Sequence, residues 1–365
     1  MSSEEEPKEP LFSEDLTRRL QSCLRCGECN LRCPVHRTLQ FNEAYSPRGW
    51  VNLASMMALR DVPVFIDKIE HMYISVLCGR CDPPCPYDVR PSELILRTRK
   101  ELIDLGYVPP LEVAALPRKI RTNLPLFEPA AQEGAWNPPR GEGGSSILYL
   151  GRWVLNSPET AVAASELAMS WLSVPSLADS RPSCGEVLRL AGYFDEAREE
   201  LESLAETFRD RGVERIVTAC PEAASRLSEA GLSAETLHES LLDANVVDER
   251  AASRRLSRGV LLVLDCWHDG ANEAIFQTLS EVNVPVVYSD ICASCGYLVT
   301  YNARPDVIER LGREIISQAE REGVAYVAFV HPAAYSAVKA ALRGIKVKPK
   351  ILDAFQLLLQ VARKA

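Results

Sequence analysis

The sequence has no apolar run long enough to cross a membrane and no apolar stretch at its N-terminus. Its strongly apolar runs, such as GVLLVL at 259–264, are as long as a strand and fall far short of the ~18 apolar residues that span a bilayer. The chain begins MSSEEEPKEP, which contains no signal-peptide core. These absences predict a soluble, cytoplasmic protein with no direct membrane span.

An excess of positive charge is also missing. The 365 residues include 41 Lys and Arg and 50 Asp and Glu, for a net charge of −9, so we expect no nucleic-acid partner. The stretch Glu142-Gly143-Gly144 is not followed by Lys-Ser/Thr at the spacing of a phosphate loop. The sequence contains no dinucleotide fingerprint and no nucleophile–base constellation, and it therefore assigns no catalytic residue.

Cysteine, in contrast, is abundant. There are twelve cysteines, and seven of them lie between Cys23 and Cys85. In a long chain without a secretion signal, clustered cysteines are more often metal ligands than disulfides, because the cytoplasm is reducing. The N-terminal cluster therefore predicts a metal-binding unit.

Composition and hydrophobic pattern divide the chain into four parts. Residues 1–12 predict an acidic tail, 13–106 a helical unit around the clustered cysteines, and 107–146, with seven of the 24 prolines, a linker. Residues 147–365 alternate strand-sized apolar runs with amphipathic stretches, which predicts the fold class α followed by α/β. The expected strands are 147–151, 215–219, 260–265, 284–289 and 324–330.

An internal repeat divides the α/β part. The triplet Ser-Cys-Gly at 183–185 recurs at 294–296, and the same shift of 111 residues places His331 opposite Cys220. Near the first strand of each copy, a shift of 114 residues places Cys266 opposite Arg152. We therefore expect two α/β pseudo-repeats, 147–255 and 256–365.

The first cysteine motif is Cys23-x2-Cys26-x2-Cys29-x3-Cys33-Pro34, the spacing of the bacterial ferredoxin run. Three thiolates at every third position can reach three corners of one iron–sulfur cube, and the fourth, before proline, turns toward the other cluster. Zinc is the alternative, but zinc sites generally use two separated cysteine pairs. The motif predicts iron–sulfur binding.

The second motif, Cys78-x2-Cys81-x3-Cys85-Pro86, has Ser75 where a fourth cysteine is expected. Two clusters with crossed ligands are predicted, of which the second is one thiolate short. The first would be a 4Fe-4S cluster held by Cys23, Cys26, Cys29 and Cys85; the second would be held by Cys33, Cys78 and Cys81, with Ser75 at the remaining corner. The second site is open to a 3Fe-4S cluster, to a 4Fe-4S cluster with a serine oxygen or water on the odd iron, or to an iron that binds something else. We favour a plain electron-transfer cluster.

These segments resemble a known family. CGECNLRCP, SPRGWVNL and CGRCDPPCPYDV resemble the two-cluster helical ferredoxin domain of heterodisulfide reductase small subunits and of the iron–sulfur subunits of glycolate, lactate and anaerobic glycerol-3-phosphate oxidising complexes. The second half resembles their cysteine-rich CCG domain. The resemblance implies an iron–sulfur electron-transfer subunit of a hetero-oligomer, with a flavoprotein or a membrane quinone-linked subunit as partner. Such a partner would hold the protein at the periphery of the membrane.

The CCG resemblance is incomplete. In that family each copy carries one Cys after the first strand, a Cys-Cys-Gly, and a later Cys-Pro-x-Cys. The expected cysteines are replaced by Arg152, Ser183, Ala223, Ser294, His331 and Ala334. In the first copy, Cys184 and Cys220 are expected to be small buried residues.

The second copy keeps a candidate metal site made of Cys266, Cys292, Cys295 and His331. This set suits a third iron–sulfur cluster or zinc. The alternative function is accordingly a catalytic reductase subunit that uses a modified metal cluster in the C-terminal domain. Since the family's ligand sets are incomplete, we predict no family-type disulfide reduction. A third hypothesis, a zinc-stabilised scaffold, requires that the N-terminal motifs hold no iron.

Overall fold

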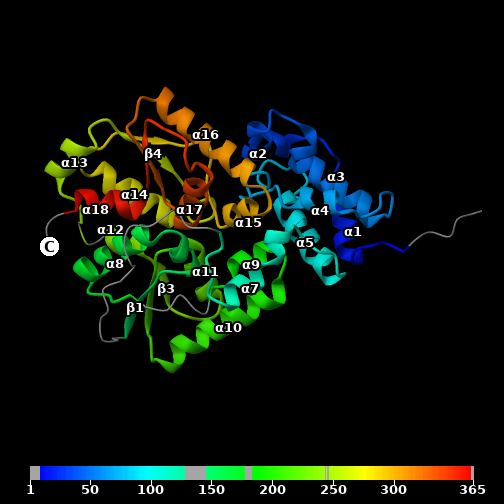
Figure 1. Ribbon diagram of the computed structural model, residues 1–365, viewed down its shortest axis with the longest axis horizontal. Helices are drawn as coiled ribbons and strands as arrows, with labels where there is room; N and C mark the ends of the chain where they lie inside the picture. The colour runs from blue at the N-terminus through cyan, green and yellow to red at the C-terminus, as the bar shows by residue number, and fades with distance from the viewer. Residues whose placement is uncertain (1–8, 128–144, 177–182, 243, 245, 363–365) are drawn as a thin grey trace, which may run out of the picture.

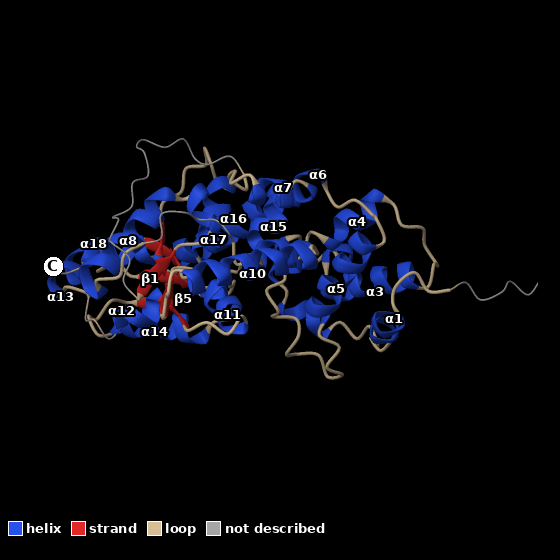
Figure 2. Ribbon diagram, turned by 90° about the horizontal axis from the view of Figure 1, so that it is seen from below, coloured by secondary structure: helices blue, strands red, loops and turns tan. Residues whose placement is uncertain are grey.

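The computed structural model describes residues 9–127, 145–176, 183–242, 244 and 246–362. Figure 1 places an all-helical N-terminal unit beside a C-terminal unit that contains all the described strands, and Figure 2 gives the same division from below. The fold is thus α followed by α/β, with small parallel sheets, as the sequence predicts.

The N-terminal unit is built from short helices separated by the cysteine-bearing loops. They are α1 (Glu14–Gln21), η1 (Glu28–Arg32), α2 (Pro34–Thr38), η2 (Glu43–Tyr45), α3 (Pro47–Ala58), α4 (Ile66–Met72) and α5 (Pro91–Asp104). The Ser13 hydroxyl caps α1 by accepting from the Leu16 amide, and proline occupies the first position of α3 and α5, where its missing N–H costs nothing. Within the predicted tail, Phe12 is buried, and the Leu11 amide donates to the Ala58 carbonyl.

Two short helices lie in the predicted linker 107–146: α6 (Leu111–Ala114) and α7 (Leu116–Arg121). Residues 128–144 of the linker fall outside the described residues.

The C-terminal unit holds two parallel sheets. One has the order β1-β2-β3, with β1 (Ser146–Tyr149), β2 (Arg215–Thr218) and β3 (Ala234–Thr236); the other has the order β5-β4-β6-β7, with β4 (Val260–Val263), β5 (Val286–Tyr288), β6 (Tyr326–Phe329) and β7 (Lys350–Asp353). Five of these strands match the sequence prediction. The pattern misses β3 (AET) and β7 (KILD), because neither contains an apolar run longer than two residues.

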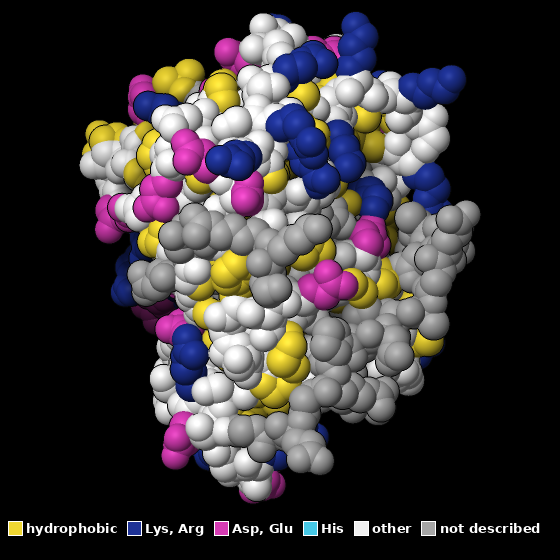
Figure 3. All heavy atoms as spheres, turned by 90° about the vertical axis from the view of Figure 1, so that its left-hand side faces the viewer, with side chains coloured by type: hydrophobic (Ala, Val, Ile, Leu, Met, Phe, Trp, Pro, Cys, Tyr) yellow, Lys and Arg dark blue, Asp and Glu magenta, His cyan; other side chains and the backbone are white. Residues whose placement is uncertain are grey.

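Helices surround the two sheets. They are η3 (Arg152–Asn156), α8 (Pro158–Leu172), α9 (Glu186–Ala191), α10 (Phe194–Asp210), α11 (Pro221–Glu229), α12 (Leu237–Leu242), α13 (Glu249–Arg255), α14 (Asp269–Ser280), α15 (Gly296–Ala303), α16 (Pro305–Arg321), α17 (Pro332–Ala341) and α18 (Ala354–Val361). The face farthest from the N-terminal unit carries Lys and Arg side chains mainly over its upper part (Figure 3). None of the helices in the described ranges combines the length and apolar character required to cross a membrane.

The two units share a continuous core. Helix α5 contacts α9, and α2 contacts α16. A buried arginine on α5, Arg99, donates to the backbone carbonyls of Met72, Ser75 and Leu190. The first two carbonyls belong to the segment that leads into the second cysteine motif, and the third belongs to α9. Arg99 therefore fixes that segment against the C-terminal unit.

Candidate metal centres

The first predicted ligand set comes together around one hollow in the N-terminal unit. Cys23, Cys26, Cys29 and Cys85 all line it, although Cys85 lies far from the others in sequence. Gly27 makes the turn with φ of 90°, and a side chain there would meet the Arg48 guanidinium at 2.9 Å. Four thiols around one hollow are a donor set that suits a 4Fe-4S cluster.

Arg48 closes one side of this hollow. Its Nη1 donates to the Arg25 carbonyl at 3.2 Å, and its Nε donates to the Glu43 carboxylate at 2.7 Å. The ion pair with Glu43 holds the Arg48 side chain beside the hollow.

The second ligand set is more deeply buried. Cys33, Cys78 and Cys81 are each at most 8% exposed. Burial raises the pKa of Cys33 to about 12, and the neighbouring Cys78 thiol adds to this effect. Burial also raises the pKa of Cys81 well above its ordinary value, and the nearby groups Asp82, Cys78 and Cys33 act in the same direction. Such thiols stay protonated unless a metal centre takes the place of the proton. The set is thus poised for a cluster but contains three thiols only.

Ser75 is buried, and its hydroxyl accepts the Leu77 amide hydrogen at 3.2 Å. Its carbonyl accepts from Arg99 and from the Thr300 hydroxyl. The serine therefore has an evident role in shaping the turn before Cys78.

The structure corrects the predicted C-terminal ligand set, because it divides that set between two groups. Cys266 and Cys292 form a disulfide, and their sulfurs lie within 4.8 Å of the Cys78 sulfur from the N-terminal unit. Cys295 and His331 belong instead to a second group, with Cys220 and Glu222, whose ligand atoms all lie within 4.8 Å of one another. Sequence spacing does not reveal this division, since each group joins segments from separate parts of the fold.

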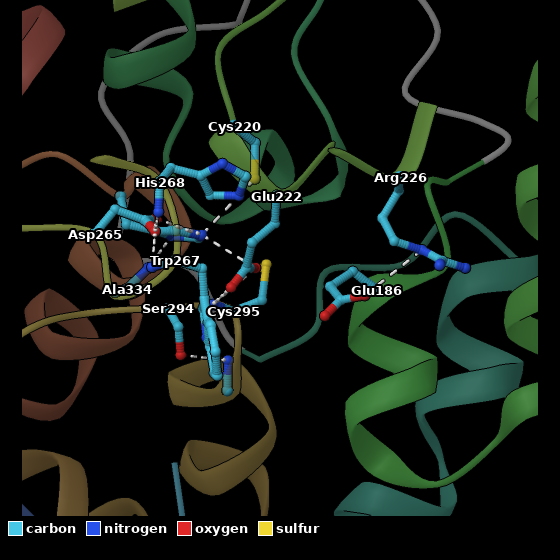
Figure 4. A network of polar contacts seen from close by, with 12 residues as sticks. Glu186, Cys220, Glu222, Arg226, Asp265, Trp267, His268, Ser294, Cys295 and Ala334 are labelled. Atoms are coloured by element: carbon cyan, nitrogen blue, oxygen red, sulfur yellow. Dashed lines mark hydrogen bonds and ion pairs between the residues drawn. The ribbon is translucent and has the colours of Figure 1, made fainter. Parts of the chain in front are cut away.

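The second group joins the loops that follow β2 and β6, one strand from each sheet. Cys220 follows β2 and precedes the Pro221 that opens α11, whereas His331 follows β6 and precedes the Pro332 that opens α17. The Cys220 sulfur lies 3.8 Å from Nε2 of His331, and the same Nε2 lies 3.2 Å from the Glu222 carboxylate. Figure 4 shows Glu222 extending toward Cys295, whose amide donates to both carboxylate oxygens at 3.0 and 3.2 Å. Cys220 is buried, as predicted, and it is in addition a member of a polar cluster.

The charges in this group stabilise one another. The hydrogen bond from Cys295 and the nearby His331 together lower the pKa of Cys220 to about 5, although burial acts in the opposite direction. Burial alone would lower the pKa of His331, but Glu222 and Cys220 raise it well above its ordinary value. A proton on Nε2 of His331 therefore faces both the Cys220 sulfur and the Glu222 carboxylate.

A further carboxylate, Asp265, faces the group from the end of β4 (Figure 4). Its Oδ1 accepts from the amides of Trp267 and His268, while Oδ2 lies 3.8 Å from Nε2 of His331 and has no hydrogen-bond partner among the described residues. Burial raises the pKa of Asp265 to about 7. Neither Asp265 nor Glu222 belongs to a cysteine motif, so neither is identified from the sequence. Their positions in the sequence are the one available indication, since Asp265 directly precedes Cys266 and Glu222 lies two residues after Cys220.

Other residues at positions related by the repeat make structural contacts. Arg152, which the repeat places opposite Cys266, donates to Asn123 and to the carbonyls of Lys119 and Leu124, which attaches the linker to the C-terminal unit. Ser183 turns its hydroxyl to the Gly185 amide. Cys184 lines a small hollow together with Cys220 and Cys295.

Residues 19–89 match the family model described as a 4Fe-4S dicluster domain. This segment contains both cysteine motifs. The N-terminal unit is a 4Fe-4S dicluster domain.

Several curated proteins are similar to parts of this chain. Over 82 residues the chain is 34% identical to the "Probable glycolate oxidase iron-sulfur subunit" of Bacillus subtilis, a match that covers 22% of this chain and 18% of that protein. Over 224 residues it is 23% identical to a subunit of the dihydromethanophenazine:CoB--CoM heterodisulfide reductase of Methanosarcina barkeri, a match that covers 55% of each chain. Over 91 residues it is 32% identical to "Lactate utilization protein B" of Bacillus thuringiensis, with 24% of this chain and 18% of that protein covered. The chain therefore spans between about a fifth and about half of the length of these relatives.

Among solved structures, the chain matches an aspartate racemase homologue from Pyrococcus horikoshii OT3 at 14% identity and a TM-score of 0.28, with 60% of this chain and 96% of that chain covered.

Proposed function

We propose that the protein is an iron–sulfur electron-transfer subunit of a hetero-oligomeric oxidoreductase, and that its dicluster domain exchanges single electrons with a flavoprotein or a membrane quinone-linked partner. The observation that carries this proposal is the gathering of Cys23, Cys26, Cys29 and Cys85 around one hollow within the dicluster domain. The names of the relatives support the class of complex. Iron–sulfur clusters supply one-electron chemistry at a potential that burial and hydrogen bonding adjust.

The chain's own residues contribute the surroundings of each site. The second set is more buried than the first, in which Cys26 is exposed and Cys23 and Cys85 are half-buried. The exposed rim of the first site is the natural point of exchange with a partner, and the buried second set faces the C-terminal unit. This order supports a relay from the surface toward the interior.

A reductive titration tests this function. Anaerobically assembled protein is titrated with dithionite and followed by electron paramagnetic resonance. We expect two one-electron steps per chain, and Cys29→Ser should shift the potential and alter the spectrum of one step while Cys81→Ser does so for the other. Cys184→Ser, a half-buried thiol outside both sets, should retain both steps. A wild-type protein that accepts no electrons would refute the proposal.

We further propose that 147–365 is a duplicated CCG-type unit with a modified metal centre at Cys220, Glu222, Cys295 and His331. The strand orders support the duplication, because β1-β2-β3 in one sheet corresponds to β4-β6-β7 in the other. In the second sheet β5 pairs with the outer side of β4, and in the first sheet the isolated parallel bridge between Leu148 and Ser176 takes the equivalent place beside β1. Two sulfurs, an imidazole nitrogen and a carboxylate, all buried, form a donor set of the kind that binds zinc. This centre favours, as the second candidate function, a reductase subunit with a metal site in its C-terminal unit.

His331 sets a condition on that centre. Its Nδ1 accepts the Ala334 amide hydrogen at 3.3 Å, which places the imidazole proton on Nε2. Binding a metal through Nε2 would move this proton to Nδ1 and end the helix-capping hydrogen bond, at a cost of about 1 kcal/mol.

Metal quantification tests this centre. The double variant Cys220→Ser/Cys295→Ser should lose one metal ion per chain, relative to wild type and to Cys184→Ser, whose thiol lies beside the group. Equal metal content in all three proteins would contradict the third centre and leave the dicluster proposal standing.

A further inference from the structure

The second cluster set lacks one thiol on the N-terminal unit, and the structure brings two others to it. The segment 75–81 lies against the loops that follow β4 and β5. Arg80 Nη1 donates to the Asp290 carbonyl at 2.6 Å, and the Ser294 hydroxyl donates to the Val76 carbonyl at 3.3 Å. These contacts hold the second motif directly against the Cys266–Cys292 pair.

Two glycines show how closely the surfaces approach. A Cβ on Gly296 would lie 1.8 Å from the Val76 carbonyl oxygen, and a Cβ on Gly79 would lie 2.0 Å from the Trp267 ring. At Gly296 the obstacle is backbone, so a side chain there would force the two segments apart. The approach is therefore built into the fold, and it leaves the sulfurs of Cys78, Cys266 and Cys292 within 4.8 Å of one another.

Backbone pairing makes the two C-terminal loops rigid. The Cys266 amide donates to the Ala293 carbonyl at 3.0 Å, and the Ala293 amide donates to the Leu264 carbonyl at 2.8 Å. The thiols of this pair are consequently presented to Cys78 by a fixed scaffold.

Ser75 is a poor substitute for the missing thiolate. Its hydroxyl already accepts the Leu77 amide hydrogen, and an alcohol is far harder to deprotonate than a thiol. Cys292, in contrast, is 7% exposed, like Cys33 and Cys78. Cys266 is only half-buried.

We propose that Cys292, from the C-terminal unit, is the fourth protein ligand of the second cluster, and that Cys266 is the neighbouring thiol that closes a disulfide with it when no cluster is bound. This inference rests on the proposed function, because it requires an iron–sulfur cluster on Cys33, Cys78 and Cys81. It makes the second cluster a covalent connection between the two units.

The disulfide must open before Cys292 can bind iron. A dithiol reductant supplies two electrons and two protons, converts the disulfide to two thiols, and becomes a disulfide itself. Cys292 then releases its proton as it binds iron.

Cluster assembly in cysteine variants of the full chain tests the proposal. Anaerobic reconstitution with iron, sulfide and a dithiol is followed by iron and sulfide quantification and by electron paramagnetic resonance of the oxidised protein. We expect Cys292→Ser to lose about one of about eight irons per chain and to display a three-iron signal, since a 4Fe-4S cluster with three thiolates readily loses its fourth iron. Cys266→Ser and Cys184→Ser should keep the wild-type iron content and spectrum.

A rescue variant separates ligation from damage to the fold. Ser75→Cys introduced into Cys292→Ser restores a thiolate at the position expected from the ferredoxin spacing and should return the iron content to about eight. Wild-type spectra in Cys292→Ser would overturn the proposal, as would loss of iron in Cys266→Ser alone. If wild type itself assembles no cluster, the proposed function fails with it; if wild type assembles two 4Fe-4S clusters and Cys292→Ser does so too, only this inference fails.

Discussion

Replacing Arg99 by methionine should destabilise the protein strongly. The Arg99 side chain is fully buried, and its guanidinium donates four hydrogen bonds, two to the Met72 carbonyl and one each to the carbonyls of Ser75 and Leu190. It also lies over the Tyr73 ring, 4.7 Å from the centroid. Methionine fills much of the same volume, so the loss comes chiefly from polar interactions.

Two opposing terms set the magnitude. Burial lowers the pKa of Arg99 from 12.5 to about 10, which corresponds to a cost of about 3 kcal/mol for burying the charge in the folded protein. Arg99→Met removes this cost. Four hydrogen bonds to a charged donor contribute about 6 to 12 kcal/mol in total. The hydrogen bonds outweigh the buried charge, and we expect Arg99→Met to lower the free energy of unfolding by at least about 3 kcal/mol.

Urea unfolding followed by far-UV circular dichroism measures this loss, with wild type and variants at the same metal loading. Arg97→Met is the matched control on the same helix: its partly exposed guanidinium pairs with Asp15, and its loss should cost at most about 1 kcal/mol. Arg99→Lys should fall between wild type and Arg99→Met, because an ammonium cannot reach three carbonyls with one planar fork. If Arg99→Met is no less stable than Arg97→Met, the reasoning is refuted.

Three further predictions concern the C-terminal unit. Arg152→Met should lower the free energy of unfolding by about 2 to 3 kcal/mol in the same urea assay, because the Leu124 carbonyl and Asn123 lose their buried donor; a change below about 0.5 kcal/mol would contradict the linker role. Gly296→Ala should destabilise by about 1 to 3 kcal/mol and alter the spectrum of the second cluster but not that of the first, because its Cβ displaces the Val76 carbonyl; an unchanged second-cluster spectrum would contradict the close docking. In metal-free protein the folded-state pKa of Asp265, about 7, exceeds its ordinary value of 3.8, so this group's contribution to stability is fully present below pH 3.8 and is lost as pH rises toward 7. Asp265→Asn can still accept from the Trp267 and His268 amides, but it does not titrate. The variant should therefore lack up to about 4 kcal/mol of the loss of unfolding free energy that wild type undergoes as pH rises from 3.8 to 7. Equal slopes of unfolding free energy against pH in the variant and wild type would contradict the assignment.

The sequence predicts the fold most reliably where local pattern and burial coincide. Strands such as β4 and β6 are apolar runs followed by turn signals, and the structure contains them at the expected places. The grouping of Cys23, Cys26 and Cys29 follows from spacing along one loop. The segment of β3, Ala-Glu-Thr, contains no apolar run and gives no comparable signal.

The C-terminal centre is less predictable because it depends on distances between separate elements. The repeat identifies Cys220 and His331 as equivalent positions, but equivalence in a duplication does not place two residues in contact. The structure brings them to 3.8 Å because the loops that follow β2 and β6 converge there. The approach of Cys78 to Cys292 is likewise a consequence of how the two units dock, and no motif within either unit encodes it.

The central claim is that the N-terminal motifs bind two iron–sulfur clusters for one-electron transfer. The most direct test is the iron, acid-labile sulfide and zinc content of the anaerobically purified full chain. The account predicts about eight irons and about eight sulfides per chain, held by the dicluster domain. Zinc without sulfide at the N-terminal cysteines would contradict it.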